Sequence, residues 1–230
     1  MMKQLVLDMG LAKGPSLSNF CAGPNAAALE HLQLWLGQPG RAGPPRSPVP
    51  TYLWGPSGCG KSHLLRALRS ALQAQGQRVG WLDATLSIAD EYDSTWSAVL
   101  LDDVHAFDAG QQQAAFNWFV NAQTQQIAVL AAGSLPPADL KLRDDLRTRL
   151  GWGHVFALQA LDEPQRREVL RASAEARGVL LPDEVMDFML TRFSRDLGSL
   201  MELLDLMDGY ALQTQRAITI PLIKTMMDNA

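Results

Sequence analysis

Short apolar runs of strand length alternate with longer amphipathic segments from Thr51 to Leu158. The short runs are TYLW, VGWLDA, AVLLDD, IAVLAAG and HVFAL, and the longer segments are KSHLLRALRSALQAQ and QQAAFNWFVNAQ, in which apolar residues recur every three or four positions. Strands that alternate with helices are typical of a parallel sheet covered by helices. The pattern therefore predicts an α/β domain in this part of the chain.

The pattern changes after Leu158, because the remaining apolar residues follow only the helical period. Start and stop signals predict four helices there, beginning at Asp162, after Pro182, near Asp196 and at Thr219. Upstream, glycine and proline gather over residues 37–50 and predict an irregular loop. We expect three parts, namely a short N-terminal segment at 1–15, an α/β domain at 16–160 and a helical domain at 161–230.

Composition narrows the class of protein. Apolar residues make up 47% of the chain and charged residues 19%, which is typical of a folded, soluble protein. The net charge of −4 argues against the basic surface of a nucleic-acid binder, and Cys21 and Cys59 are too few for a disulfide framework. The apolar start is interrupted by Asp8, and no run reaches the roughly 18 apolar residues of a membrane span. We expect a cytoplasmic protein with no membrane contact and no direct sequence-specific DNA binding.

A phosphate-binding motif follows the first of these strands. The stretch GPSGCGKS comes after TYLW and opens an amphipathic helix, which is the context that a P-loop requires. Its glycines let backbone N–H groups turn toward phosphates, Lys61 supplies a charge for the β- and γ-phosphates, and Ser62 can ligate Mg²⁺. The alternative is a chance glycine-rich turn. The predicted nucleotide-binding residues are Gly55, Pro56, Ser57, Gly58, Cys59, Gly60, Lys61 and Ser62.

Two carboxylates end the apolar strand AVLLDD. A strand buried beside the P-loop strand places Asp102 at its C-terminal edge, where it can hold the metal together with Ser62. Asp103 then stands where it can polarise a water molecule. The alternative is that the paired acids only cap the next segment. With the P-loop present, we predict a Mg²⁺ site at Asp102 and a catalytic role for Asp103.

The doubled acid is typical of the AAA+ branch of P-loop proteins, and three longer stretches make the resemblance more specific. LRTRLGWG, NFCAGPNAAALEHL and LLDDVHAF resemble the corresponding segments of the bacterial replication initiator DnaA. The resemblance covers nearly the whole chain. It implies a five-stranded parallel sheet, a small C-terminal α-helical lid domain, and ATP or ADP with Mg²⁺ as cofactors.

The same resemblance assigns a role to Arg149. This residue matches the family's arginine finger, which reaches a neighbouring subunit's nucleotide and stabilises charge on the γ-phosphate. A guanidinium suits that task because it is always charged and forks onto phosphate oxygens. The alternative is a surface arginine paired with Asp144 or Asp145. Because Arg149 lies within LRTRLGWG, we predict the finger.

The sequence also departs from the initiator's pattern. Only TLSIADEYDSTW fills the gap in which the initiator has an extra helix that grips single-stranded DNA, and no DNA-binding helix-turn-helix domain follows the lid helices. The polar sensor expected after IAVLAAG falls at Gly133 or Ser134, and the lid arginine falls at Gly198, with Arg195 the nearest substitute. We expect weak intrinsic hydrolysis.

A DnaA-like unit without these DNA-binding parts resembles the Hda-type regulatory inactivators of DnaA. Those proteins carry a hexapeptide near the N-terminus that binds the replicase sliding clamp, and QLVLDM has its form through Gln4, Leu5, Leu7 and Met9. Alternate side chains of an extended segment enter adjacent pockets. The alternative is an edge strand packed on the chain's own body.

The expected function is thus regulation of DnaA, with the clamp and DnaA as partners and a homo-oligomer possible. The alternative is an autonomous DnaA-like or helicase-loading ATPase that binds DNA or a helicase. A small-molecule kinase is a more distant option, since its substrate lid would lie between strands. Two further predictions concern other residues. Phe116, Trp118 and Phe119 should lie on a helix and face the protein core, and His105 should have a local role in a helix or loop.

Overall fold

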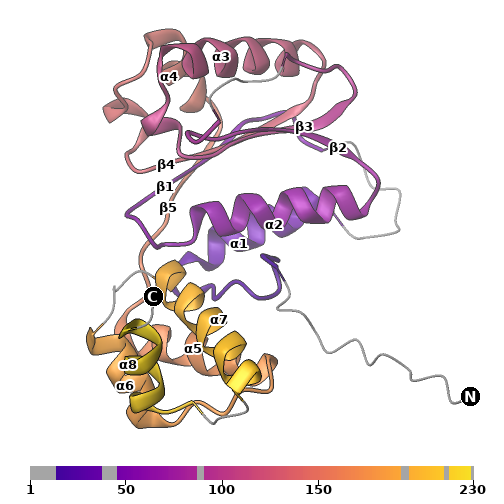
Figure 1. Ribbon diagram of the computed structural model, residues 1–230. Coiled ribbons are helices and arrows are strands. Elements are labelled where there is room, and N and C mark those ends of the chain that lie inside the picture. Colours follow the sequence, from indigo (N-terminus) through magenta and orange to yellow (C-terminus); the bar gives the residue numbers. More distant parts are fainter. Residues whose placement is uncertain (1–13, 38–45, 87–90, 193–196, 215–217, 229–230) are drawn as a thin grey trace, which may run out of the picture. The chain divides into compact units, whose positions relative to one another are not determined.

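A computed structural model describes residues 14–37, 46–86, 91–192, 197–214 and 218–228. The chain divides into two compact units, one spanning Pro15–Ala160 and the other containing Leu161–Ala230. Figure 1 shows an α/β unit and a helical unit, which are described separately below.

The α/β unit is built on a five-stranded sheet whose strands are all parallel (Figure 1). The order across the sheet is β2-β3-β4-β1-β5, so the P-loop strand β1 lies between β4 and β5. This confirms the predicted fold class. The strands are β1 (Thr51–Trp54), β2 (Arg78–Leu82), β3 (Trp96–Leu101), β4 (Ala128–Gly133) and β5 (His154–Ala157).

Helices cover both faces of the sheet (Figure 1). On one face, α1 (Ala26–Leu36) and α2 (Lys61–Ala74) pack in a core with Leu53, Leu100 and Leu130. On the other, α3 (Ala109–Thr124) and α4 (Asp144–Leu150) pack in a second core with Val99 and Val129. Because both faces are buried, β3 and β4 are almost continuously apolar, as the sequence pattern indicated.

Three short 3₁₀ turns, η1 (Gly23–Asn25), η2 (Val104–Ala106) and η3 (Pro137–Asp139), complete the unit. The described residues between β2 and β3 form no helix. The prediction for α3 is confirmed for Trp118 and Phe119, which are buried. It is wrong for Phe116, which is only half-buried; the side chains of Arg143 and Arg149 lie over its ring.

The helical unit consists of α5 (Glu163–Ala176), α6 (Asp183–Arg192), α7 (Leu197–Thr214) and α8 (Ile220–Asp228). Asp162 caps α5 through a capping box with Gln165, which satisfies backbone N–H groups at the helix start. Leu170, Met186 and Leu204 lie in one apolar core that all four helices share. Among the helices that the structure describes, none has the length and apolar character needed to cross a membrane.

Candidate nucleotide-binding site and arginine finger

The P-loop joins β1 to α2 along the path Gly55–Gly60, and the structure leaves no room for a side chain at its first and last glycines. Gly60 has φ +94° and lies under Phe20, so a Cβ there would come 2.5 Å from the phenyl ring. A Cβ at Gly55 would overlap the carbonyl oxygen of Leu158. Glycine is required at both positions because the loop must turn tightly and then deliver its N–H groups to the start of α2.

Lys61 is the first residue of α2, and its side chain is folded back into the loop. Its Nζ donates to the carbonyl oxygens of Gly55 and Pro56, at 2.8 Å each, and lies 3.6 Å from Cys59 Sγ. Lys61 is only 7% exposed. Two carbonyl oxygens and a weakly accepting sulfur leave the charge of this ammonium group without a counter-charge in the loop, and phosphate oxygens arriving there would supply one. The loop therefore has the donor set that a nucleotide phosphate requires.

Ser62 and Asp102 meet across the P-loop and the end of β3. The Ser62 hydroxyl donates to Asp102 Oδ1 at 3.0 Å, and the backbone N–H of Asp103 donates to the same oxygen at 3.1 Å. Asp102 is buried, and burial, together with the negative charge of Asp103, raises the pKa of its carboxyl group. A divalent cation would offset this cost. A hydroxyl and a carboxylate are oxygen ligands of the kind that Mg²⁺ uses alongside nucleotide phosphates and water, so the pair fits the predicted metal.

Asp103 follows in a left-handed conformation, with φ 52° and ψ 41°, which starts the η2 turn. Its carboxylate is about half exposed and lies 4.0 Å from His105 Nδ1. That nitrogen also accepts a hydrogen bond from the backbone N–H of Ser134, at 3.3 Å. His105 thus touches the end of β4, which the sequence-based expectation of a local loop role missed.

Gly133, one of the two positions at which the sensor was expected, ends β4, and Ser134, the other, follows it. A Cβ there would overlap the hydroxyl group of Tyr52 and come 3.2 Å from Val104. The Tyr52 hydroxyl donates to the Leu135 carbonyl at 2.8 Å, and burial raises the pKa of this phenol. Tyr52 therefore fills the space that a side chain at residue 133 would need.

Arg149 projects from α4 without a direct salt bridge to any carboxylate that the structure describes. Its Nη1 donates to the backbone carbonyl of Asp145 at 3.0 Å, and its guanidinium lies 4.8 Å from the ring centre of Phe116 and 5.2 Å from that of Trp152. Within the described residues, no carboxylate oxygen lies within 4.0 Å of this guanidinium. Arg149 is therefore held by two rings and one carbonyl.

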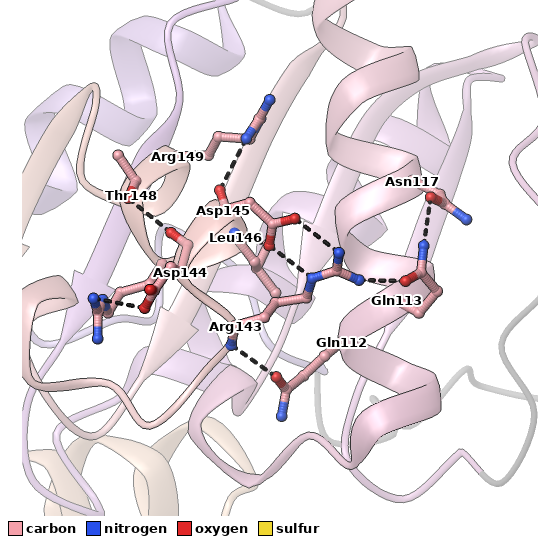
Figure 2. Close-up of polar contacts among 10 residues, drawn as sticks. Gln112, Gln113, Asn117, Arg143, Asp144, Asp145, Leu146, Thr148 and Arg149 are labelled. Carbon is pink, nitrogen blue, oxygen red and sulfur yellow. Dashed lines mark hydrogen bonds and ion pairs between the residues drawn. The ribbon is translucent and has the colours of Figure 1, made fainter.

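Figure 2 shows the polar partners of Asp144 and Asp145, the two acidic residues near Arg149. The Asp145 carboxylate receives two hydrogen bonds from Arg143, at 2.7 and 2.8 Å, and Arg143 also bonds to Gln113 of α3. Asp144 pairs with Arg147 at 2.8 Å. The carboxylates considered as partners for Arg149 thus form their salt bridges with other arginines. The hydrogen bonds and charge of Arg143, and then the charge of Arg149, lower the pKa of the Asp145 carboxyl group.

Two family models match parts of the chain. Residues 162–227 match the family described as "Hda, lid domain", and residues 51–132, from β1 into β4, match one described as "RNA helicase". An uncharacterized protein of Haemophilus influenzae is 31% identical over 240 residues, which cover 99% of this chain and 100% of that protein. The chain belongs to the Hda-type, DnaA-like AAA+ family.

Solved structures agree on the AAA+ fold. Domain III of the replication initiation protein DnaA from Thermotoga maritima has a TM-score of 0.73 and 21% identity, with 93% of this chain and 95% of that one covered. AMPPCP-bound DnaA from Aquifex aeolicus has a TM-score of 0.64 and 24% identity, with 84% and 64% covered. The Thermotoga maritima RuvB branch migration motor has a TM-score of 0.62 and 17% identity, with 94% and 72% covered.

Some predicted residues of this Hda-type protein lie outside the described residues. These are the four residues of the clamp-binding motif, Gln4, Leu5, Leu7 and Met9, and the substitute lid arginine, Arg195. Gly198, which occupies the position expected for the lid arginine, is described and lies exposed in the first turn of α7. The predicted site residues that the structure does describe, namely the P-loop, Asp102, Asp103 and Arg149, all lie in the α/β unit.

Proposed function

We propose that this protein lowers the frequency of replication initiation by inactivating DnaA. In its nucleotide-bound form it docks on the DNA-loaded sliding clamp through the QLVLDM segment and presents Arg149 to ATP held by DnaA. DnaA then hydrolyses that ATP and passes to its ADP form. The observation that carries the proposal is the state of Arg149, whose guanidinium contacts Phe116 and Trp152 and forms no direct salt bridge with a carboxylate in the described residues.

The physical argument concerns charge on the transferring phosphoryl group. Negative charge on the γ-phosphate oxygens must be stabilised while water attacks, and a guanidinium can bond to two of those oxygens at once. An arginine that is already oriented loses less side-chain freedom when it docks. Contact with each ring is worth roughly 0.5–1 kcal/mol at an exposed site, which orients Arg149 without trapping it.

Arg149 also lies away from the layer that carries its own P-loop helix. α4 packs with α3 on one face of the sheet, whereas α2 packs on the other (Figure 1). This supports an action on the nucleotide of a neighbouring molecule. It also agrees with α4 being short and being followed by the exposed Trp152, because the finger segment then stands at the surface.

The protein's own nucleotide serves assembly more than turnover. ATP or ADP would be held by Gly55–Ser62, with Mg²⁺ at Ser62 and Asp102, and the bound metal would neutralise phosphate charge. Lys61 would exchange its contacts with loop carbonyls for phosphate oxygens. Asp103 would orient a water molecule, but Gly133, one of the two candidate sensor positions, has no side chain to assist it. We therefore propose weak intrinsic ATPase activity at most.

Docking on the clamp would bring the protein close to DNA, to which its own net negative charge does not attract it. An extended QLVLDM segment would place Leu5, Leu7 and Met9 in adjacent pockets while Gln4 and the main chain form hydrogen bonds. Tethering to a clamp on DNA raises the local concentration of the finger near DnaA without any new contact. The net charge of −4 fits a protein that reaches DNA through a partner.

The docking step is tested by measuring clamp binding with the full-length protein in ATP, ADP and no nucleotide. The variant Gln4→Ala/Leu7→Ala should lose clamp binding, whereas Leu11→Ala, an apolar change beyond the motif, should keep it. Retained clamp binding in the double variant would show that QLVLDM is not the docking segment. Strong, salt-dependent binding to single-stranded DNA without the clamp would instead favour the helicase-loading alternative.

A further inference from the structure

Arg143 holds the carboxylate of Asp145 with both arms of its guanidinium (Figure 2). Its Nε donates to Asp145 Oδ1 at 2.7 Å, and its Nη2 donates to Oδ2 at 2.8 Å. The backbone N–H of Leu146 adds a third hydrogen bond, to Oδ1 at 2.8 Å. A guanidinium that forks onto both oxygens forms a strong and directional pair. The carboxylate is therefore fixed in place, and Arg143 compensates its charge.

The guanidinium of Arg143 is itself held by residues of α3. Its Nη1 donates to Gln113, and its backbone N–H donates to Gln112 Oε1 at 3.0 Å. Its charged group lies 4.6 Å from the ring centre of Phe116. These contacts orient the fork toward the start of α4, so binding the carboxylate costs little further side-chain freedom.

Asp145 also lies within reach of the finger, Arg149. The two residues are four positions apart on α4, with the acid nearer the N-terminus, which is the favourable spacing and order for an ion pair on a helix. Arg149 Nη1 lies 3.0 Å from the Asp145 carbonyl oxygen. After the hydrogen bonds from Arg143, the charge of Arg149 further lowers the pKa of the Asp145 carboxyl group. Two arginines thus compete for one carboxylate, and Arg143 is the one that binds it.

We propose that Arg143 is a positioning residue for the arginine finger, because it holds the Asp145 carboxylate and so keeps Arg149 from forming an ion pair within its own helix. This inference rests on the proposed action of Arg149 on ATP bound to DnaA. Without Arg143, the carboxylate would turn to Arg149, and that pair would have to break before the guanidinium reached the γ-phosphate.

The spacing sets the size of the effect. An ion pair four positions apart on a helix shifts an equilibrium by a factor of about two, and the strongest exposed pairs shift it by about five. The fraction of protein with a free finger would fall by a similar factor. Loss of Arg143 should therefore lower the stimulation of DnaA by about two- to fivefold, far less than loss of the finger itself.

The test is a double-mutant cycle in the full-length protein, measured as hydrolysis of DnaA-bound ATP at equal occupancy of DNA-loaded clamp. Arg143→Met removes the fork but keeps a long side chain over Phe116. Asp145→Asn keeps an acceptor for the Leu146 N–H and removes the charge that would bind Arg149. Thermal unfolding checks that each variant folds.

Arg147→Met is the matched control. This substitution also frees an acid at the start of α4, because Arg147 pairs with Asp144. Asp144 lies five positions before Arg149, a spacing that does not place the two side chains on one side of the helix. Stimulation by Arg147→Met should therefore stay close to that of wild type.

We expect Arg143→Met to lower the stimulation by about two- to fivefold while Asp145 is present, and to have little effect when combined with Asp145→Asn. Equal losses in both backgrounds would show a structural role or a direct contact with DnaA, and would overturn the inference, as would no loss in Arg143→Met. If wild-type protein failed to stimulate DnaA, the proposed function would fail and this inference with it.

A crystal structure of the Arg143→Met variant tests the positioning without DnaA. It should show the Asp145 carboxylate in a direct salt bridge with Arg149. An Arg149 guanidinium that kept its contacts with Phe116 and Trp152 and formed no such bridge would contradict the inference, whatever the outcome of the hydrolysis assay.

Discussion

Gly133 is the position at which the structure makes its most quantitative prediction. In Gly133→Ala the new methyl group would overlap the Tyr52 hydroxyl and approach Val104 at 3.2 Å. Overpacking of this kind costs about 1–3 kcal/mol in buried sites. The loss of glycine's freedom in the unfolded chain offsets about 0.4–1 kcal/mol of that cost. We expect Gly133→Ala to lower the free energy of unfolding by about 1–2 kcal/mol.

A second substitution isolates the cause. Tyr52→Phe alone removes the hydrogen bond to Leu135 and should cost about 1 kcal/mol. It also removes the hydroxyl that the new methyl group meets, and the nearest ring atom then stands 3.3 Å away. The double variant should therefore be more stable than the sum of the single effects by about 1–2 kcal/mol.

The assay is chemical denaturation of all four proteins under one set of conditions, with equal m-values as the check on two-state unfolding. If Gly133→Ala were as stable as wild type, or if the two substitutions were additive, Tyr52 would not occupy the sensor space. The structural explanation for the missing sensor would then be wrong.

Three further predictions concern charge. Burial and then the neighbouring His154 lower the pKa of His31 below 6.5, so the contribution of neutral His31 to stability is complete above pH 6.5. It is lost as pH falls from 6.5 through the lowered pKa of the folded state. Unfolding midpoints from pH 5 to 8 should show this loss, and His31→Gln should reduce it. Because the pKa of Asp102 is raised, its charged form costs stability at pH 7, and Asp102→Asn should raise the thermal unfolding midpoint in the absence of nucleotide. The same substitution should weaken Mg²⁺-nucleotide binding, measured by calorimetry, by at least about tenfold. A lowered midpoint would contradict this prediction. Trp152→Ala should reduce stimulation of DnaA by about two- to fivefold through loss of one ring contact to Arg149, whereas Trp152→Phe should retain most of it in the same ATPase assay.

The sheet and the P-loop could be predicted because their signals are local. Each buried strand is a nearly continuous apolar run, and GPSGCGKS carries its own strand and helix as context. The meeting of Ser62 with Asp102 also follows, since parallel strands bring their carboxyl ends to one edge of the sheet. The lid helices were located by equally local signals, such as the Asp162 cap.

What sequence reasoning missed depends on contacts between distant residues. No local pattern shows that Tyr52 fills the space beside Gly133 or that His105 reaches Ser134, 29 positions away. Phe116 was expected in the core because its spacing is helical, but spacing does not reveal that Arg149 and Arg143 lie over its ring. The pairing of Asp145 with Arg143 and of Asp144 with Arg147 likewise could be seen only in the folded structure.

The central claim is that Arg149 acts on ATP bound to DnaA. Its most direct test is single-turnover hydrolysis of that ATP in the presence of DNA-loaded clamp, with wild-type protein, Arg149→Lys and Arg149→Ala compared at equal clamp occupancy. The account predicts that Arg149→Ala binds the clamp normally but loses the stimulation, by a factor on the order of 10³ or down to the unstimulated rate, and that Arg149→Lys recovers little because it lacks the fork. Stimulation by Arg149→Ala equal to that of wild type would contradict it.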